Sequence, residues 1–266
     1  MKKVIYNILK KFGIRVITNK RDSEIKVEIN NLKKELLTLR FLKEAEITNS
    51  NIFFQLAESS KSQLFQDWFV LNQLNYKRDG FFVEIGAANG LELSNTYLLE
   101  KEFAWKGILS EPSPYWKTEL ESNRDCIIDL RCVYKNSNQK IDFLESDDKY
   151  YSTISAYDNL DLHHNKRINS IKYEILTVTL EDLFESHNAP KEIDYLSIDT
   201  EGSEYEILKN FNFDKYSFNV VTIEHNYNKN KDLIDNLFLK NGYLKKFEKL
   251  SAFESWFIKS PSKSTK

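Results

Sequence analysis

The sequence contains few cysteines and no long apolar run, and each absence excludes a class of protein. Its two cysteines, Cys126 and Cys132, lie in a stretch that reads as buried, which favours reduced thiols over a disulfide framework. No run of 18 apolar residues occurs, and the first residues lack the apolar segment and small-residue cleavage site of a signal peptide. We therefore expect a cytoplasmic protein that does not span a membrane.

The sequence also lacks an excess of charge of either sign. Its 38 Lys and Arg residues nearly balance 40 Asp and Glu residues, and both signs are mixed along most of the chain. No global field would attract nucleic acid, so we expect no nucleic-acid partner. Neither a Gly-x-Ser-x-Gly segment nor a P-loop appears, which argues against a hydrolase triad and an NTPase.

Residues 1–50 differ from the rest because they are rich in lysine, with one glycine and no proline. They predict a helical N-terminal extension. An apolar stripe within residues 4–12, flanked by lysines, is typical of an amphipathic helix. This helix either docks on the protein itself or on a sister subunit, or lies through residues 1–20 on the inner face of a membrane.

A second pattern in the extension is a coiled-coil seam. Five apolar residues alternate at spacings of four and three: Ile25, Ile29, Leu32, Leu36 and Leu39. The seam is just over two heptads long, and coiled coils normally extend for three or four. A homo-oligomer formed through residues 25–39 is therefore a hypothesis.

From about residue 59, short apolar strands alternate with amphipathic helices, and a polar loop covers residues 145–169. The expected strands cover residues 81–85, 107–109, 127–133, 140–144, 175–178, 195–198, 220–223, 243–249 and 255–258. The expected helices cover residues 63–74, a segment after 94–95, 115–123, 180–186, 205–210 and 231–241. This alternation predicts an α/β domain over residues 51–260 with a doubly wound, mainly parallel sheet, followed by a disordered tail at 261–266.

Polar residues follow the ends of the expected strands, where such sheets bind ligands. The first cluster reads VEIGAANG and places Glu84 inside the strand end, before Gly86, Ala87 and Gly90. The glycines allow a sharp turn close to a ligand. The spacing differs from the G-x-G-x-x-G of a nicotinamide site, and the acid would repel a pyrophosphate. It suits instead the ammonium group of S-adenosylmethionine.

The second cluster is Glu111-Pro112, after the next strand. A carboxylate at this position can accept hydrogen bonds from both hydroxyls of a ribose, which is the role of the acid in dinucleotide folds. Together the two clusters predict a site for an adenosine-type ligand.

In these two clusters and in further segments along the chain, the sequence resembles the FkbM family of methyltransferases. The resemblance runs roughly from residue 62 to 258 and rests on FFVEIGAANGLELSNTYLLEKEFAWKGILSEPSP, YSTIS, IDYLSIDTEGSEYEIL, IEHNY, KNGYLKKFEKL and ESWFI. It implies a Rossmann-like fold with a seven-stranded sheet and S-adenosylmethionine as methyl donor. It also implies that Asn95, in SNT, and Ser152, in YSTIS, approach the cofactor. The chain departs from the family at Phe65, where a small residue, often glycine, is expected.

The resemblance further implies methyl transfer to oxygen, commonly to a hydroxyl of a sugar or natural product. Many relatives are encoded near genes for surface polysaccharides, so a glycan is the favoured acceptor. Such a transfer needs a group that removes the acceptor's proton. Asp199 and Glu201, in D-x-EG, and His225 follow two neighbouring strands, and we expect these three to be catalytic, with Asp199 also bordering the cofactor.

An alternative for the same strand ends is a metal site. Asp199, Glu224 and Asn226 offer three oxygen ligands that suit Mg²⁺ or Mn²⁺ and would orient the acceptor hydroxyl. Two other functions stay open. One is a nucleotide-sugar or NAD-dependent enzyme on a similar sheet, and the other is a non-catalytic assembly factor that retains the methyltransferase fold.

Overall fold

The computed structural model describes residues 19–44, 50–158 and 164–261 of the chain. The chain divides into two compact units, Met1–Thr48 and Asn49–Lys266. In the first unit the structure describes one long helix, α2 (Asn19–Glu44). The predictions for residues 1–18, including most of the membrane-contacting segment, and for the tail from residue 262 onward lie outside the described residues. No helix in the described ranges has the length and hydropathy needed to cross a bilayer.

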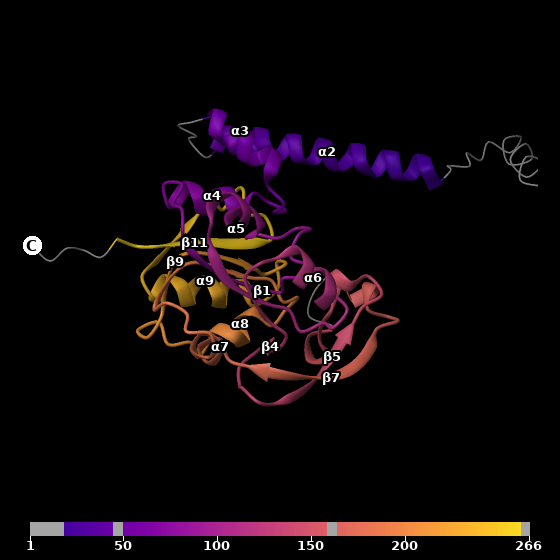
Figure 1. The fold of residues 1–266 in the computed structure, drawn as a ribbon, viewed down its shortest axis with the longest axis vertical. Helices are drawn as coiled ribbons and strands as arrows, with labels where there is room; N and C mark the ends of the chain where they lie inside the picture. The colour runs from indigo at the N-terminus through magenta and orange to yellow at the C-terminus, as the bar shows by residue number, and fades with distance from the viewer. Residues whose placement is uncertain (1–18, 45–49, 159–163, 262–266) are drawn as a thin grey trace, which may run out of the picture. The chain divides into compact units, whose positions relative to one another are not determined.

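The second unit is built on a seven-stranded sheet. Its strands are β1 (Phe81–Ile85), β2 (Lys106–Ser110), β3 (Ile127–Asp129), β8 (Glu192–Ile198), β9 (Ser217–Glu224), β10 (Tyr243–Lys246) and β11 (Glu254–Lys259). They lie in the order β10-β11-β9-β8-β1-β2-β3, as Figure 1 shows in part. All neighbours pair in parallel except β11, which is antiparallel to both β9 and β10.

The strand order reverses at the centre of this sheet. From β1 the chain winds outward through β2 to β3, then returns to β8 on the other side of β1 and continues to β9. This is a doubly wound, mainly parallel sheet, so the predicted fold class is confirmed. In such sheets ligands bind at the carboxyl ends of the strands beside the reversal, which here are β1 and β8.

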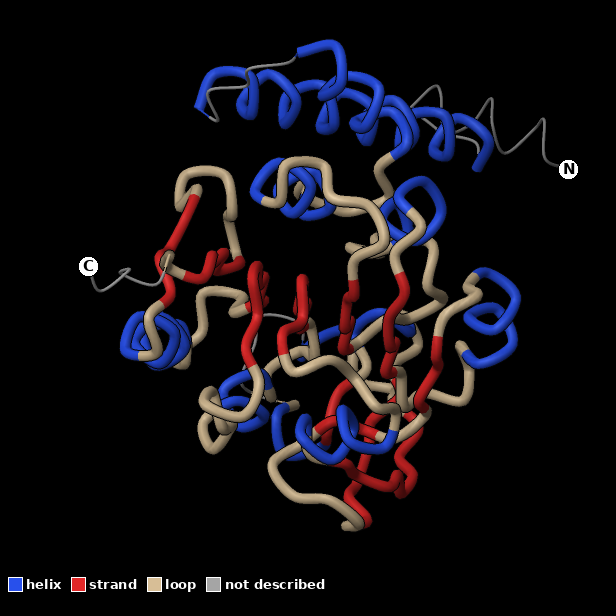
Figure 2. The backbone as a smooth tube through the Cα atoms, turned by 60° about the vertical axis from the view of Figure 1, so that its left-hand side comes forward, coloured by secondary structure: helices blue, strands red, loops and turns tan. Residues whose placement is uncertain are grey.

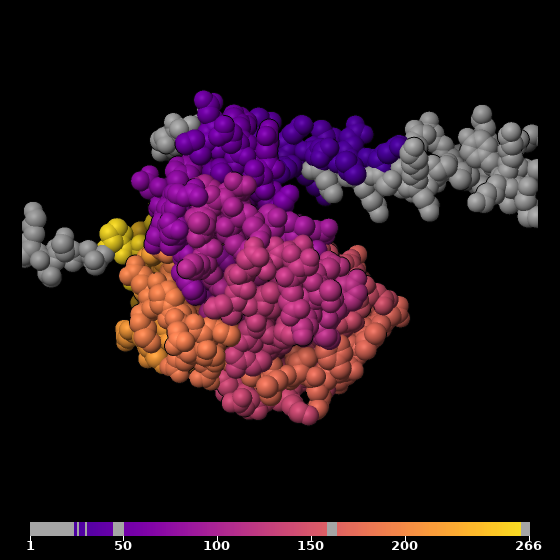
Figure 3. All heavy atoms as spheres, viewed as in Figure 1, coloured from indigo at the N-terminus to yellow at the C-terminus, as the bar shows by residue number. Residues whose placement is uncertain are grey.

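Helices cover both faces of the sheet (Figure 2). They are α4 (Gln66–Gln73), α5 (Tyr97–Phe103), α6 (Lys117–Asn123), α7 (Leu180–Ser186), α8 (Glu204–Leu208) and α9 (Lys231–Lys240). A further helix, α3 (Ser50–Ser59), packs on α4 through Phe53 and Trp68, with ring centroids 5.1 Å apart. Consecutive residues of β11 show the two layers, because neighbouring side chains of a strand point to opposite faces. Trp256 stacks on Phe69 of α4 with ring centroids 4.7 Å apart, and Phe257 stacks on Phe238 of α9 at the same distance. In Figure 3 the purple and yellow segments accordingly meet on the surface.

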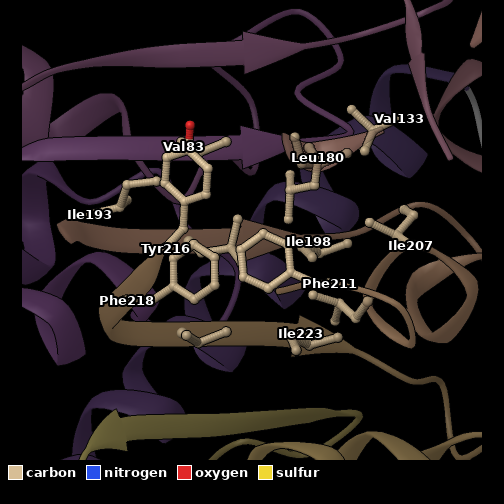
Figure 4. Close-up of a cluster of buried hydrophobic side chains, with 14 of the residues drawn as sticks. Val83, Val133, Leu180, Ile193, Ile198, Ile207, Phe211, Tyr216, Phe218 and Ile223 are labelled. Carbon is tan, nitrogen blue, oxygen red and sulfur yellow. The ribbon is translucent and has the colours of Figure 1, made fainter. Parts of the chain in front are cut away.

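The largest core lies on the face covered by α7, α8 and α9. Val83, Ile198 and Ile223 point from three adjacent strands toward Leu180 of α7 and Ile207 of α8 (Figure 4). Each fully buried aliphatic side chain of this kind stabilises the fold by about 1.5–3 kcal/mol. The central strands are buried along almost their whole length, which explains why they read as continuous apolar runs.

The structure also contains a second sheet that the sequence did not predict. It has the order β4-β7-β5-β6, with β4 (Cys132–Val133), β5 (Lys140–Glu145), β6 (Thr153–Ile154) and β7 (Ile171–Val178). The single strand expected over residues 127–133 is wrong, because β3 pairs with β2 in the large sheet whereas β4 pairs with β7. The expected polar loop holds β6 and three short 3-10 helices, η1 (Lys149–Tyr151), η2 (Ser155–Tyr157) and η3 (His164–Lys166).

The helix expected over residues 63–74 begins later, at Gln66. Phe65 precedes it in the left-handed backbone region, with φ of 61°. A bulky residue is rare there, whereas glycine adopts this conformation at little cost. The family's preference for a small residue at this position therefore has a backbone cause. Phe65 is itself buried, and its ring meets Phe53 of α3 edge to face at 5.8 Å.

Candidate functional site

A cavity of about 370 Å³ opens at the carboxyl ends of β1, β2, β8 and β9. This is the edge where the strand order reverses. Eleven of the thirteen residues predicted to form the site line it; ten of them are Glu84, Gly86, Ala87, Asn95, Glu111, Pro112, Ser152, Asp199, Glu201 and Glu224. Asn226, the remaining predicted metal ligand, lines it as well, whereas Gly90 and His225 are outside the lining.

The turn after β1 is fixed by Gly86. Its φ is +85°, and a Cβ added there would lie 1.8 Å from the backbone oxygen of Asp199. The Gly86 amide also donates to the Ser110 carbonyl at 2.9 Å. Only glycine allows the ends of β1, β2 and β8 to approach this closely. Gly90, in contrast, faces Leu120 and Arg124 behind the cavity, so its role here is to let α6 pack against the turn.

Glu84 organises the segment that follows the turn. Its carboxylate accepts hydrogen bonds from the Ser94 hydroxyl at 3.0 Å, the Asn95 amide at 2.8 Å and the Thr96 hydroxyl. The buried guanidinium of Arg124 lies 3.7 Å away and donates to the Ser94 and Thr96 hydroxyls. The SNT segment is therefore clamped onto the strand end, and Glu84 both lines the cavity and shapes its wall.

Arg124 was missed in the sequence. No motif marks it, and its function depends on a contact across 40 positions of sequence. It is fully buried and pairs with Glu100 at 2.8 Å as well as with Glu84.

Glu111 presents a carboxylate at the end of β2. One oxygen accepts from the Ala88 amide at 2.9 Å and the other from the Ser113 amide at 2.8 Å. Burial raises the pKa of Glu111 to about 7, although the two amides oppose the shift. Each oxygen keeps a lone pair, so the ionised group can accept two further hydrogen bonds, as a ribose diol requires.

Asn95 places an acceptor in the cavity wall that no described residue satisfies. Its Nδ2 donates to the Ser197 hydroxyl at 2.9 Å, while its buried Oδ1 has no hydrogen-bond partner among the described residues. An unpartnered buried polar atom is costly unless a ligand pairs with it. The oxygen therefore fits a ligand that carries a donor, such as an ammonium group.

Three acidic side chains converge at the ends of β8 and β9. Carboxylate oxygens of Asp199, Glu201 and Glu224 all lie within 4.8 Å of one another. Burial raises the pKa of Glu224 well above its usual range, and the negative charges of Asp199 and Glu201 add to the shift. The raised pKa favours the protonated form of Glu224, and the oxygens of the cluster could equally be ligands of a hard divalent cation.

His225 does not meet the geometric requirement for the predicted general base. The residue is buried and outside the cavity lining, and its Nδ1 accepts from the Tyr227 amide at 3.0 Å. Burial lowers the pKa of His225 to about 4, so the ring is neutral. Its Nε2 has no partner among the described residues. Side chains alternate at a strand end, which directs Glu224 into the cavity and His225 away from it.

Three tyrosines line the cavity, Tyr150, Tyr151 and Tyr227, and the predicted site residues include none of them. Tyr151 lies on η1, and burial raises its pKa with a further contribution from the charges of Glu201 and Glu224. Tyr227 follows the end of β9 and is 66% exposed. Tyr151 thus lies near the acidic cluster, and Tyr227 lines the same cavity.

The chain was compared with known proteins. Residues 84–245 match the family described as the methyltransferase FkbM domain. Among solved structures, the chain is similar to the precorrin-6y C5,15-methyltransferase of Geobacter metallireducens GS-15, with 10% identity over 68% of this chain and 71% of that one and a TM-score of 0.36. It is also similar to M. capricolum TrmK in complex with S-adenosyl-homocysteine, with 14% identity, 72% and 66% coverage and a TM-score of 0.35. No curated protein matches it.

The doubly wound sheet, the glycine turn at β1 and the acid after β2 form a site suited to an adenosine-type ligand, and the family match identifies the class as methyltransferases that use S-adenosylmethionine. The family match covers more than half of the chain, so this protein belongs to the FkbM methyltransferase family. The cavity fits that donor chemically, because Glu111 suits the ribose hydroxyls and the Asn95 carbonyl suits a cationic amino group. The family match rejects the alternative of an NAD-dependent enzyme.

Proposed function

We propose that this enzyme transfers the methyl group of S-adenosylmethionine to a hydroxyl oxygen of an uncharged sugar, glycan or natural product. The observation that carries the proposal is the cluster of Asp199, Glu201 and Glu224 in the wall of the same cavity as Gly86 and Glu111. Methyl transfer to a hydroxyl needs a proton acceptor beside the donor's methyl group, and the cluster is that acceptor.

Within the cluster, Asp199 is the base. It is the least buried of the three acids. Its backbone is fixed against the cofactor turn, since its amide donates to the Ile85 carbonyl at 3.0 Å and its carbonyl packs on Gly86. Its side chain lines the cavity, where it is placed to accept the hydroxyl proton. S-adenosylmethionine supplies the activated methyl group, so no further activation of the donor is needed.

The charges of the cavity favour an acceptor without an acidic group. Among the described residues that line it, six are acids and one is a base: Glu84, Glu92, Glu111, Asp199, Glu201 and Glu224 against Lys149. Lys149 already pairs with Glu145 at 2.8 Å. Outside the lining, Arg124 lies 3.7 Å from Glu84 and Arg167 lies 3.4 Å from Glu201, so these two acids are partly offset. The acids still outnumber the bases, which disfavours a uronate or phosphate relative to a neutral hydroxyl compound. Tyr151 and Tyr227 offer aromatic faces on which a sugar ring can pack.

The test is methyl transfer from labelled S-adenosylmethionine to glycan extracts of the source cell, and then to purified acceptors in matched pairs, a hexoside and its uronate. We expect label on oxygen and a kcat/KM for the hexoside at least about tenfold higher, equivalent to about 1.4 kcal/mol. Asp199→Asn should lower kcat by about 10²–10⁴. Label found only on nitrogen or protein, or a variant with more than half of the wild-type rate, would refute the proposal.

A divalent cation is the second candidate for the cluster, favoured by the approach of the three carboxylates to within 4.8 Å. Asp199 and Glu224 would be ligands as expected, Glu201 would join them, and the amide of Asn226 also lines the cavity. A bound Mg²⁺ or Mn²⁺ would lower the pKa of the acceptor hydroxyl. Activity lost on treatment with EDTA and restored by either ion would establish this role, whereas activity that chelation leaves unchanged would assign proton removal to Asp199 alone.

The assembly-factor alternative predicts a different outcome. A protein that only retains the fold would keep its full cellular activity when Asp199→Asn is introduced, whereas the enzyme would lose it. We also propose a cytoplasmic location, in keeping with Cys126 and Cys132, both of which are free thiols.

A further inference from the structure

Helix α2 exposes an apolar stripe along its length. The five seam residues Ile25, Ile29, Leu32, Leu36 and Leu39 are 39% to 63% exposed. Five large aliphatic side chains in one row on a 26-residue helix are unusual for a surface that stays in water. The spacings of four and three place them at the a and d positions of a heptad, with Ile29 and Leu36 at a.

The residues flanking the stripe carry a complementary charge pattern. Glu28 and Glu35 occupy g positions, and Lys33 and Arg40 occupy e positions. All four are exposed. In a parallel coiled coil, a g residue lies beside the e residue five positions later on the partner helix. Glu28 would then meet Lys33 of a second copy, and Glu35 would meet its Arg40.

An antiparallel arrangement would have the opposite effect. It brings g beside g and e beside e, which places glutamates against each other and lysine against arginine. Like charges at these positions destabilise the pairing. The pairs made by Glu28 and Glu35 are therefore complementary in only the parallel orientation, whereas the sequence also places Arg21 at g and Lys26 at e, which are a like-charge pair there.

We propose that α2 is a dimerisation helix, which pairs with α2 of a second copy of this chain in a parallel, two-stranded coiled coil. The partner that covers the apolar stripe is a second copy of this chain, because α2 carries both the acidic and the basic residue of each interhelical ion pair. Ile29 at a, with Leu32 and Leu39 at d, is typical of two strands, while Ile25 at d and Leu36 at a depart from that preference. The seam covers just over two heptads of the 26-residue helix, so the flanking ion pairs must add to the stability of the pairing.

The first test uses charge-swapped full-length chains. Glu28→Lys with Glu35→Lys makes both flanks basic, and Lys33→Glu with Arg40→Glu makes both flanks acidic. We expect the wild type to sediment at twice its 31.4 kDa mass at micromolar concentrations. Each swapped chain alone should sediment as a monomer, and an equimolar mixture should restore the dimer. A monomeric or trimeric wild type, or swapped chains that dimerise alone, would overturn the proposal.

The second test measures orientation with a disulfide. Leu39→Cys, made with Cys126→Ser to remove the more accessible native thiol, should crosslink to its counterpart on oxidation. In a parallel pair the two positions face each other, within the Cα separation of about 7 Å that a disulfide allows. In an antiparallel pair residue 39 lies opposite residue 25, and the two cysteines would be about 21 Å apart.

The matched control is Asn31→Cys in the same background. Asn31 is exposed at a c position on the outer side of α2, so it should not crosslink. Crosslinking of Asn31→Cys as readily as Leu39→Cys, or no crosslink at position 39 in a chain that sediments as a dimer, would contradict the parallel pairing.

Discussion

Replacing Glu111 by glutamine should stabilise the free protein at high pH while weakening its hold on S-adenosylmethionine. The buried carboxyl has a pKa of about 7, against an ordinary value of 4.5, because burial penalises its ionised form. The unfolded chain therefore loses this proton at lower pH than the folded chain does. The free energy of unfolding therefore falls progressively as the pH rises from 4.5 to about 7. Above about pH 7 the full loss remains.

The size of the effect follows from the pKa difference. A difference of about 2.5 pH units corresponds to about 3 kcal/mol of stability at pH 8, and to less than about 1 kcal/mol at pH 5. Glutamine cannot ionise, so the variant lacks this pH-dependent loss. It accepts only one of the two amide hydrogen bonds, from Ala88 or Ser113, at a cost of about 1–3 kcal/mol that does not depend on pH.

The assay is urea unfolding of wild type and Glu111→Gln at pH 5 and pH 8 without ligand. The variant's free energy of unfolding, relative to wild type, should rise by about 2.5 kcal/mol between the two pH values. Other titrating groups cancel in this difference as long as they do not interact with residue 111. If the difference in free energy of unfolding between the variant and the wild type is the same at both pH values, the pKa of Glu111 is not raised. The free enzyme would then not lose stability by keeping this buried acid in its ligand site.

Three substitutions test other parts of the structure. Gly86→Ala should destabilise the protein by more than about 4 kcal/mol in urea unfolding, because its Cβ would overlap the Asp199 carbonyl; a soluble, equally stable variant would contradict the packing of this turn. His225→Gln should change kcat less than about threefold, whereas loss of a general base costs at least about a hundredfold; a loss of that size would restore His225 as the base. Phe65→Gly relieves about 1–2 kcal/mol of left-handed strain but loses a buried ring worth about 3–5 kcal/mol, so it should lower the free energy of unfolding. A more stable variant would show that the strain dominates.

The strand ends could be predicted from the sequence because the signals there are local. Apolar runs ended at polar residues at four places, and a parallel sheet brings such ends to one edge. Glu84, Glu111, Asp199 and Glu224 accordingly line one cavity. The order of the strands was not predicted, because it depends on which strands pair, and the structure gives it as β10-β11-β9-β8-β1-β2-β3.

Other features depend on contacts between distant segments, which no local pattern reveals. The small sheet forms because β4 pairs with β7, 45 positions later at Cys132 and Thr177. Arg124 was missed for the same reason, since its partner Glu84 lies on another element. The error on His225 was avoidable. It is the neighbour of Glu224 at the end of a strand, and alternation places only one of the two in the cavity.

Titration calorimetry of S-adenosylmethionine into the wild type and Glu111→Gln at pH 8 tests the cofactor site most directly. We expect one molecule bound per chain, and a loss of about 1–3 kcal/mol in the variant, which is a weakening of roughly 5- to 150-fold. For the wild type, affinity should also fall about tenfold from pH 8 to pH 6 as Glu111 takes up its proton. No binding to the wild type, or equal affinity for both proteins, would contradict the placement of the methyl donor in this cavity.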